Sequence, residues 1–265
     1  MSLKTKLTGF KSMLSFDNRS QLILNRLLFP NEPVLHYRLN SVTFIENREG
    51  GDANGARDLL TSTMYSAYLE HLQMADTVSV LDLGANNGGF PLMLKCLGRN
   101  VGRLACVEMN PFVVARLLYN IRHNFGTQAK VINAAVVGSP RKIVMPLSLG
   151  STSESVFASA KGSVGERSYE VEGRTFDEIY IECFGADHIV DICKIDIEGA
   201  EFEVLFSDNA NLVLQCRCVF MEIHSLPNRD RSTLVENMIK RGFALVAPEN
   251  SVDNWVYCFK NTSRN

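Results

Sequence analysis

The sequence lacks cysteine pairs of the C-x-x-C kind, long apolar runs and an excess of charge of either sign. Its seven cysteines are odd in number and scattered, mostly inside apolar stretches, which favours buried reduced thiols over disulfides or a zinc site. No apolar run reaches the ~18 residues of a membrane-spanning helix, and residues 1–14 are too polar for a signal peptide. The net charge of −2 offers no basic surface for nucleic acid or anionic lipid. These absences predict a cytoplasmic protein with no nucleic-acid partner and no stable membrane anchor, and they leave the oligomeric state open.

The length of 265 residues and the hydrophobic content of 46% indicate one large globular domain, with or without a small appendage. We expect an N-terminal extension at residues 1–57 and a larger domain at 58–265. In the extension, a helical pattern stops before Pro30, and the alternation of VLHYRL and VTFIEN around Asn40-Ser41 predicts a β-hairpin. Residues 58–75 read as one amphipathic helix.

From residue 78 onward, predicted strands alternate with helices, which indicates a parallel sheet. We expect its strands at 78–84, 103–110, 129–137, 191–197, 217–224, 243–248 and 254–260. The turn before the last strand is short enough to permit only an antiparallel pair. The predicted fold class is therefore α/β: a Rossmann-like sheet of seven strands, six parallel and one an antiparallel hairpin strand, with helices on both faces. That architecture is typical of class I methyltransferases, here with a helix and hairpin extension and a β insertion before the fourth strand.

The glycine-rich turn in VSVLDLGANNGGF (78–90) departs from the G-x-G-x-x-G fingerprint of dinucleotide-binding proteins, because Asn86 stands where a pyrophosphate needs no side chain. Asp82 would repel a pyrophosphate but suits the cationic amino end of S-adenosylmethionine. Glu108 closes the second strand and can accept both ribose hydroxyls, a role that fits NAD equally well. The combination favours S-adenosylmethionine, since a turn that only packs a helix on a strand explains neither acidic strand end. The expected cofactor-binding residues are Asp82, Gly84, Asn86, Gly88, Glu108, Asn110, Asn133, Ala134 and Asp196.

Charge is concentrated in DICKIDIEGAEFEVL (191–205), at the carboxyl end of the fourth strand. Open α/β sheets bind their ligands at this edge. Lys194 and Asp196 alternate with apolar residues, so both side chains project to one side of the sheet. Glu198 and Glu201 fall on the following turn and the first turn of a helix, where acidic residues also complement the helix dipole.

This stretch resembles the hallmark of the FkbM family of S-adenosylmethionine-dependent methyltransferases, which is close to K-I-D-(V/I)-E-G-x-E-x-x-V-L. Residues 194–205 match it without a gap, and LDLGANNGG, VEMNP, GSTSESVF, RTFDEI and MEIH follow in family order over 78–224. Met109 is a departure, because the family more often has proline there. The resemblance implies methylation of a hydroxyl on a sugar or glycan, or on a polyketide-type small molecule, with S-adenosylhomocysteine as the product.

Methyl transfer from a sulfonium requires positioning of the acceptor and a base for the hydroxyl proton. We expect His224, Asp196 and Glu201 to be catalytic. His224 is attractive because its ordinary pKa lies near neutrality, although a histidine after a strand is often only a structural hydrogen-bonding group. The expected substrate-binding residues are Glu198, Glu222, Ser153 and Ser155, the serines lying in a Ser/Gly-rich loop at 148–168.

Three alternatives stay open. Asp196, Glu222 and His224 could together ligate a divalent metal, but the magnesium pattern of catechol-type methyltransferases is missing, so no metal site is predicted. A non-catalytic S-adenosylmethionine-binding regulatory module would keep the cofactor residues Asp82 and Glu108 and lose the later motifs. Those motifs, KIDIEGAE at 194–201 and EIH at 222–224, are intact here. A nicotinamide oxidoreductase is disfavoured by Asn86 and Asp82.

Overall fold

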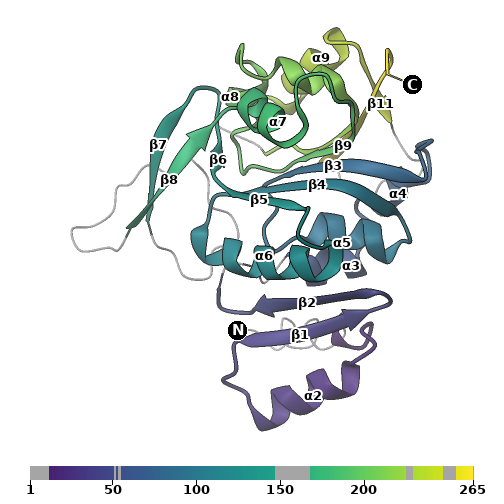
Figure 1. Ribbon diagram of the computed structural model, residues 1–265, viewed down its shortest axis with the longest axis vertical. Helices are drawn as coiled ribbons and strands as arrows, with labels where there is room; N and C mark the ends of the chain where they lie inside the picture. The colour runs from purple at the N-terminus through teal and green to yellow at the C-terminus, as the bar shows by residue number, and fades with distance from the viewer. Residues whose placement is uncertain are drawn as a thin grey trace.

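The computed structural model describes residues 12–50, 52, 55–146, 168–224, 229–246 and 255–264. Its main sheet has seven strands in the order β11-β12-β10-β9-β3-β4-β5 (Figure 1). All run parallel except β12, which is antiparallel to both of its neighbours, so the predicted fold class is confirmed. The strands are β3 (Thr77–Leu83), β4 (Asn100–Glu108), β5 (Lys130–Asn133), β9 (Val190–Ile195), β10 (Cys216–Glu222), β11 (Phe243–Val246) and β12 (Val256–Asn261).

Helices cover both faces of this sheet. One face carries α3 (Ala56–Thr61), α4 (Ser66–Leu69), α5 (Gly89–Cys96) and α6 (Pro111–Phe125); the other carries α7 (Phe176–Phe184), α8 (Glu201–Leu205), a 3₁₀ helix (Asn211–Gln215) and α9 (Arg231–Lys240). Successive residues of a strand point to opposite faces, so Val219 packs into one core and Phe220 into the other. Two separate apolar cores therefore fix the sheet between its helices.

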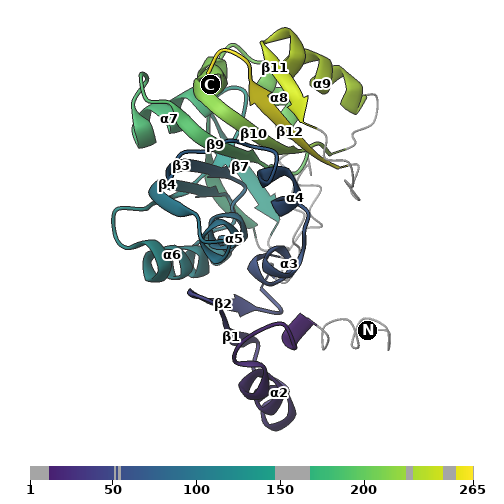
Figure 2. The same cartoon turned by 90° about the vertical axis from the view of Figure 1, so that its right-hand side faces the viewer.

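The N-terminal extension packs beneath α5 and α6 (Figure 2). It consists of α2 (Arg19–Leu28) and a hairpin of β1 (Val34–Leu39) and β2 (Val42–Asn47). Asn120 and Asn124 on α6 accept the Ile45 and Thr43 backbone N–H groups at 2.8 and 3.1 Å. The hairpin was correctly predicted. The boundary predicted at 57/58 falls inside α3, and the division into two domains stays a proposal.

A three-stranded sheet forms the insertion before the fourth strand of the main sheet, as predicted. Its strands lie in the order β6-β8-β7 and are β6 (Ala135–Val136), β7 (Arg141–Pro146) and β8 (Ser168–Arg174). The loop predicted to bind substrate through Ser153 and Ser155 lies outside the described residues.

Two secondary-structure predictions were wrong. The single helix expected at 58–75 is α3 and α4, separated where Ser62 is extended (φ −105°, ψ 157°) and its hydroxyl accepts the Met64 N–H at 3.0 Å. Such local bonding competes with a helix. The strand expected at 129–137 is divided between β5 and β6 in different sheets, because the Ala134 N–H donates to the carbonyl of Glu108 as the chain leaves the main sheet.

All seven cysteines are free thiols. Among the residues that the structure describes, no helix has both the length and the apolar character that crossing a membrane demands.

Candidate active site

The glycine turn after β3 is shaped by left-handed backbone conformations. Gly84 (φ +73°), Asn86 (φ +47°) and Gly88 (φ +95°) all have positive φ. A Cβ added at Gly84 would lie 1.6 Å from the carbonyl oxygen of Asp196, a distance that no side chain can occupy. Only glycine fits this position, and its absence of a side chain brings the turn directly against the end of β9.

Glu108 organises the neighbouring edge, at the carboxyl end of β4. Its Oε2 accepts the backbone N–H of Asn86 at 2.9 Å, and its Oε1 accepts that of Asn110 at 2.8 Å. Asn110 in turn caps α6 by accepting the N–H of Phe112 at 3.0 Å. The Asn133 amide donates to the carbonyls of Glu108 and Met109, both at 2.9 Å. The predicted cofactor residues Asn86, Glu108, Asn110, Asn133 and Ala134 are therefore brought together at one edge of the sheet.

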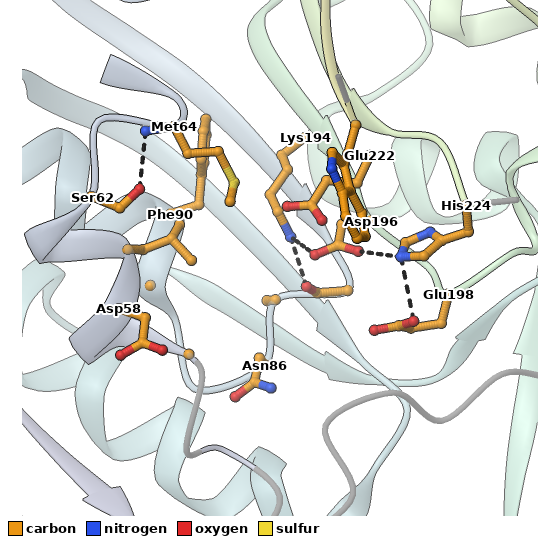
Figure 3. A pocket seen from close by; sticks show the side chains of 16 residues that line it. Asp58, Ser62, Met64, Asn86, Phe90, Lys194, Asp196, Glu198, Glu222 and His224 are labelled. Atoms are coloured by element: carbon orange, nitrogen blue, oxygen red, sulfur yellow. Dashed lines mark hydrogen bonds and ion pairs between the residues drawn. The ribbon is translucent and has the colours of Figure 1, made fainter. Parts of the chain in front are cut away.

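A cavity of about 520 Å³ opens beside the glycine turn, at the carboxyl ends of β9 and β10 (Figure 3). Its lining comes from α3 with the loop that follows, the glycine turn with the start of α5, the carboxyl ends of β9 and β10, and Trp255 just before β12. The ends of β9 and β10 and the residues after them contribute Asp196, Glu198, Glu222 and His224. Four of the residues predicted from the sequence to be catalytic or substrate-binding thus surround one cavity.

Lys194 forms the floor of this cavity and is 4% exposed. Its Nζ donates to the carbonyl of Gly84 at 2.9 Å and to Asp196 Oδ2 at 3.0 Å, and it lies 3.5 Å from Asp82 Oδ1. Burial opposes the charge of Lys194, but the carboxylates of Asp196 and Asp82 outweigh it and raise the pKa. The ammonium therefore stays protonated and serves as the counterion of both carboxylates.

Asp82 lies beneath Lys194, is fully buried and is not among the residues that line the cavity. Burial raises the pKa of Asp82 to about 6, although the charge of Lys194 acts in the opposite direction. The sequence placed Asp82 beside the amino end of the cofactor, whereas in the structure the ammonium beside Asp82 is that of Lys194. This geometry favours a supporting role for Asp82, with Asp196 as the carboxylate that faces the cavity.

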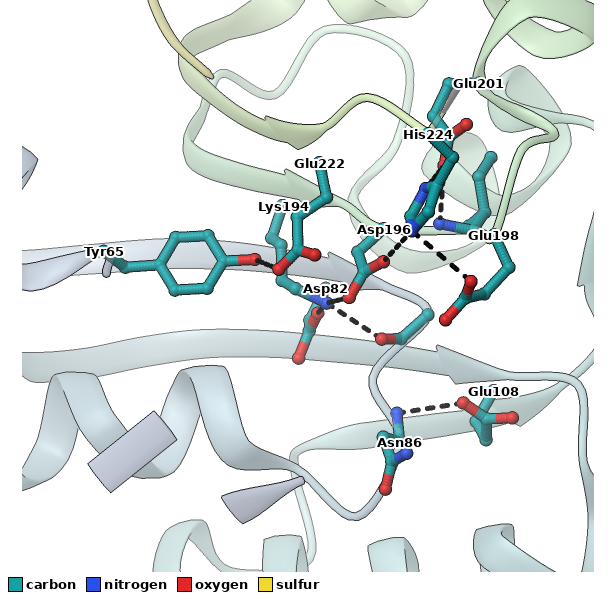
Figure 4. Close-up of polar contacts among 12 residues, drawn as sticks. Tyr65, Asp82, Asn86, Glu108, Lys194, Asp196, Glu198, Glu201, Glu222 and His224 are labelled. Atoms are coloured by element: carbon teal, nitrogen blue, oxygen red, sulfur yellow. Dashed lines mark hydrogen bonds and ion pairs between the residues drawn. The ribbon is translucent and has the colours of Figure 1, made fainter. Parts of the chain in front are cut away.

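His224 stands among three carboxylates just after β10 (Figure 4). Its Nδ1 lies 2.9 Å from Glu201 Oε1, and its Nε2 lies 3.3 Å from Glu198 Oε2 and 3.8 Å from Asp196 Oδ1. Burial lowers the pKa of His224, but the hydrogen bond to Glu201 and the three negative charges raise it to about 9. Burial likewise raises the pKa of Glu198 to about 7. His224 and Glu198 are therefore two contacting groups whose pKa values lie between neutral and alkaline pH.

Glu201 is placed behind His224 rather than in the cavity. Its side chain is fully buried, and its Oε1 accepts the N–H groups of Ile197 and Gly199 at 3.1 and 3.2 Å besides contacting His224. It is not among the cavity-lining residues. The structure thus makes Glu201 a group that orients the imidazole.

Glu222 faces the cavity from the end of β10 and is held by Tyr65, whose hydroxyl donates to Glu222 Oε1. Burial raises the pKa of Glu222, and the charge of Asp196 adds to the effect. Tyr65 is 1% exposed, and burial raises the pKa of its phenol as well, so it remains a donor.

The sequence did not predict Tyr65 as a site residue, nor the cavity-lining residues Asp58, Met64, Phe90 and Trp255. Their helical or strand patterns show which residues are apolar, but not which of them border a cavity.

The ligand atoms of Asp196, Glu198 and His224 lie within 4.8 Å of one another, a spacing that a cation could bridge. When the imidazole is protonated, its charge faces the same two carboxylates. The prediction that no metal is bound stays a prediction.

The sheet order with one reversed strand, and a polar cavity at the carboxyl edge beside a glycine turn, define a class I methyltransferase. Comparison with protein-family models then matches residues 82–245, more than half of the chain, to the methyltransferase FkbM domain. The chain belongs to this family of S-adenosylmethionine-dependent methyltransferases, and S-adenosylmethionine is its cofactor.

Solved structures of similar fold include the methyltransferase FkbM from Methylobacillus flagellatus KT, with 16% identity and a TM-score of 0.50. The match covers 74% of this chain and 46% of that one, so the chain spans about half the length of this relative. Aeropyrum pernix fibrillarin in complex with S-adenosylmethionine matches with 13% identity over 86% of this chain and 93% of its own, at a TM-score of 0.41. M. capricolum TrmK in complex with S-adenosylhomocysteine matches with 9% identity over 75% and 68%, at a TM-score of 0.40. A comparison with curated proteins gives no match.

Proposed function

We propose that this protein transfers the methyl group of S-adenosylmethionine to a hydroxyl of a sugar, glycan or polyketide-type small molecule. The observation that carries the proposal is the contact between His224 Nε2 and Glu198 Oε2, 3.3 Å apart, in the cavity beside the glycine turn. A hydroxyl needs a base when it attacks a sulfonium, and a pair that titrates between neutral and alkaline pH supplies one.

The cofactor is held along the glycine turn and the end of β4. The backbone at Gly84, Asn86 and Gly88 offers a surface without bulky side chains, and Asn86 also lines the cavity. The backbone N–H groups of Asn86 and Asn110 fix the Glu108 carboxylate at the end of β4, where it accepts hydrogen bonds from the ribose hydroxyls. Asn110, Asn133 and Ala134 surround Glu108 on the adenine side. When bound, S-adenosylmethionine supplies an activated methyl group.

The residues after β9 and β10 position the acceptor and take its proton. Asp196, fixed through Oδ2 by Lys194, and Glu222, fixed by Tyr65, accept hydrogen bonds from the acceptor. The proton goes to the Glu198–His224 pair, with the imidazole oriented by Glu201 at Nδ1. Fixed partners reduce the reorganisation needed when the acceptor hydroxyl develops negative charge.

A non-catalytic S-adenosylmethionine-binding module is the alternative. Such a module requires the glycine turn and Glu108 but has no use for a histidine fixed by three carboxylates. Retention of that cluster beside the cavity favours an enzyme.

The test is methyl transfer from methyl-labelled S-adenosylmethionine to sugar, glycolipid and polyketide fractions of the organism that encodes the protein. We expect an alkali-stable labelled ether in one fraction, lost in Glu198→Gln although this variant still binds S-adenosylhomocysteine. Cofactor binding without transfer to any fraction would favour the regulatory module. Labelled N-methyl or C-methyl products would retain the enzyme class and overturn the hydroxyl acceptor.

A further inference from the structure

We infer that the methyl acceptor is an uncharged or amine-bearing polyol, and that the cavity rejects phosphorylated, sulfated and carboxylated acceptors. The inference rests on the proposed function and narrows it to one class of acceptor. It depends on three features of the cavity: the excess of carboxylates on its wall, the engagement of its cations, and its apolar face.

Carboxylates dominate the charged side chains of the wall. Asp58, Asp196, Glu198 and Glu222 line the cavity, whereas its cationic side chains are Lys194 and His224. Bound S-adenosylmethionine adds a net single positive charge, so four carboxylates then face three positive charges, those of Lys194, protonated His224 and the cofactor. An anion drawn into this space meets like charges on several sides.

Both cationic side chains of the wall already contact carboxylates of the protein. Lys194 directs its ammonium to the Gly84 carbonyl, Asp196 and Asp82. His224 faces Glu201 through Nδ1 and the carboxylates of Asp196 and Glu198 through Nε2. Both cations are therefore already paired within the protein.

No arginine belongs to the cavity lining in the part of the chain that the structure describes. Two arginines contact residues of the wall, and their guanidinium groups are engaged there. Arg57 forms ion pairs with Glu46 and Asp58, and Arg231 stands over the ring of Trp255 at 5.7 Å from its centroid. Phosphate and carboxylate recognition ordinarily uses arginine forks or unpaired lysines. The wall lacks both.

The same wall suits a neutral polyol. Hydroxyl groups donate hydrogen bonds to carboxylates, and Asp58, Glu198 and Glu222 offer such acceptors from different sides of the cavity. Met64, Phe90 and Trp255 supply apolar surface between them, and Trp255 is 59% exposed. Apolar surface with a few polar groups is the usual composition of a small-molecule site. An ammonium on the acceptor would gain further from the carboxylates.

The first experiment separates labelled products by charge. After incubation with methyl-labelled S-adenosylmethionine and an unfractionated acceptor extract, the products are passed over an anion exchanger at neutral pH. Unreacted S-adenosylmethionine is a cation and is not retained, so each fraction is compared with a reaction that lacks the extract. We expect the excess label in the unretained fraction. Excess label that elutes only at high salt would overturn the inference while confirming a methyltransferase; no excess label in any fraction would instead contradict the proposed function.

The second experiment alters the wall. Asp58→Asn removes a carboxylate from the acceptor side, and Glu236→Gln on α9 removes the same charge from an exposed site outside the cavity. Two competing probes are compared as inhibitors of methyl transfer: methyl glucoside and methyl glucoside 6-phosphate. Two like charges about 6 Å apart in an effective dielectric of about 20 change binding on the order of 100-fold.

We expect methyl glucoside to inhibit wild type and Glu236→Gln much more strongly than its 6-phosphate does. In Asp58→Asn the ratio of the two inhibition constants should fall at least several-fold. Equal preferences in Asp58→Asn and Glu236→Gln, or stronger inhibition of the wild type by the phosphate, would show that the wall does not select against anions.

Discussion

The cofactor edge at β4 and β5 and the cavity edge at β9 and β10 are built differently. At the first, backbone groups make most of the contacts: the N–H groups of Gly84 and Ala85 donate to the Val107 carbonyl, and Glu108 accepts from the Asn86 N–H. At the second, charged side chains are balanced against one another. The first edge therefore depends on conformations that glycine adopts, and the second depends on the ion pairs of Lys194 and His224 with carboxylates.

The largest expected effect is at the turn that joins the two edges. Gly84→Ala places a Cβ against the Asp196 carbonyl, so turn and strand must separate, and we expect S-adenosylhomocysteine binding to be lost. Gly98→Ala is the matched control, because Gly98 also has positive φ (+77°) but nothing within 4 Å of an added Cβ. Calorimetric titration and thermal unfolding of both variants check this. A folded Gly84→Ala protein with wild-type affinity would place the cofactor elsewhere.

At the cavity edge we expect His224→Asn to lower kcat by about 10²–10⁴-fold and to leave the cofactor affinity nearly unchanged. In the proposed mechanism the imidazole belongs to the proton-accepting pair, and the cofactor is held at the other edge. Steady-state kinetics and titration with S-adenosylhomocysteine give the two quantities. A parallel loss of affinity would show that the edges are not separable in function.

The pH dependence gives an independent check on His224. The groups that act on it are Asp196, Glu198, Glu201 and, more weakly, Glu222. Its pKa in the folded protein, about 9, lies above the ordinary 6.5, so protonation stabilises the fold below pH 6.5 and this contribution is lost as pH rises through 9. The difference in unfolding free energy between wild type and His224→Asn should shrink over that interval, while kcat of the wild type rises.

Lys194→Met tests the charge balance beneath the cavity. We expect a loss of about 3 kcal/mol in the free energy of unfolding, because Asp82 is left buried without its counterion. Adding Asp82→Asn should restore part of this loss, because it removes the fully buried charge, whereas Asp196 still lacks its Lys194 partner. Chemical denaturation of the single and double variants measures the coupling. Additive effects would mean that the two side chains are independent.

The sheet, the hairpin and the cofactor edge could be predicted because each is encoded in a local pattern. Alternation, turn residues and the interval between a strand and the next helix lie within a few consecutive residues. The side of the sheet shared by Lys194 and Asp196 followed from the same alternation. The partner of Lys194 did not, because the pairing of Asp82 with Lys194 depends on the register of β3 against β9.

The rest of the cavity could not be read from local patterns. Tyr65 reaches Glu222 across 157 residues of sequence, a contact that depends on packing α4 against the sheet. The interruption of the helix at Ser62 likewise follows from a side-chain bond that the periodicity of 58–75 does not reveal. Glu201 matched the hallmark, but its position behind His224 became clear only from its burial.

The smallest expected effect concerns Glu108 at the end of β4. It tests whether Glu108 and Asp82, the acidic residue near the end of β3, have different roles. We expect Glu108→Ala to weaken S-adenosylmethionine binding by about 1.5–3 kcal/mol, because ribose hydroxyls lose a charged acceptor and the Asn86 and Asn110 N–H groups lose theirs. Glu108→Gln keeps one acceptor oxygen and should lose less. Asp82→Asn, which changes a residue that does not line the cavity, should affect stability more than affinity. Calorimetric titration and denaturation of the three variants separate these effects. Unchanged affinity in a folded Glu108→Ala protein would remove Glu108 from the cofactor site, and an equal loss in Asp82→Asn would show that both acidic strand ends support the cofactor in the same way.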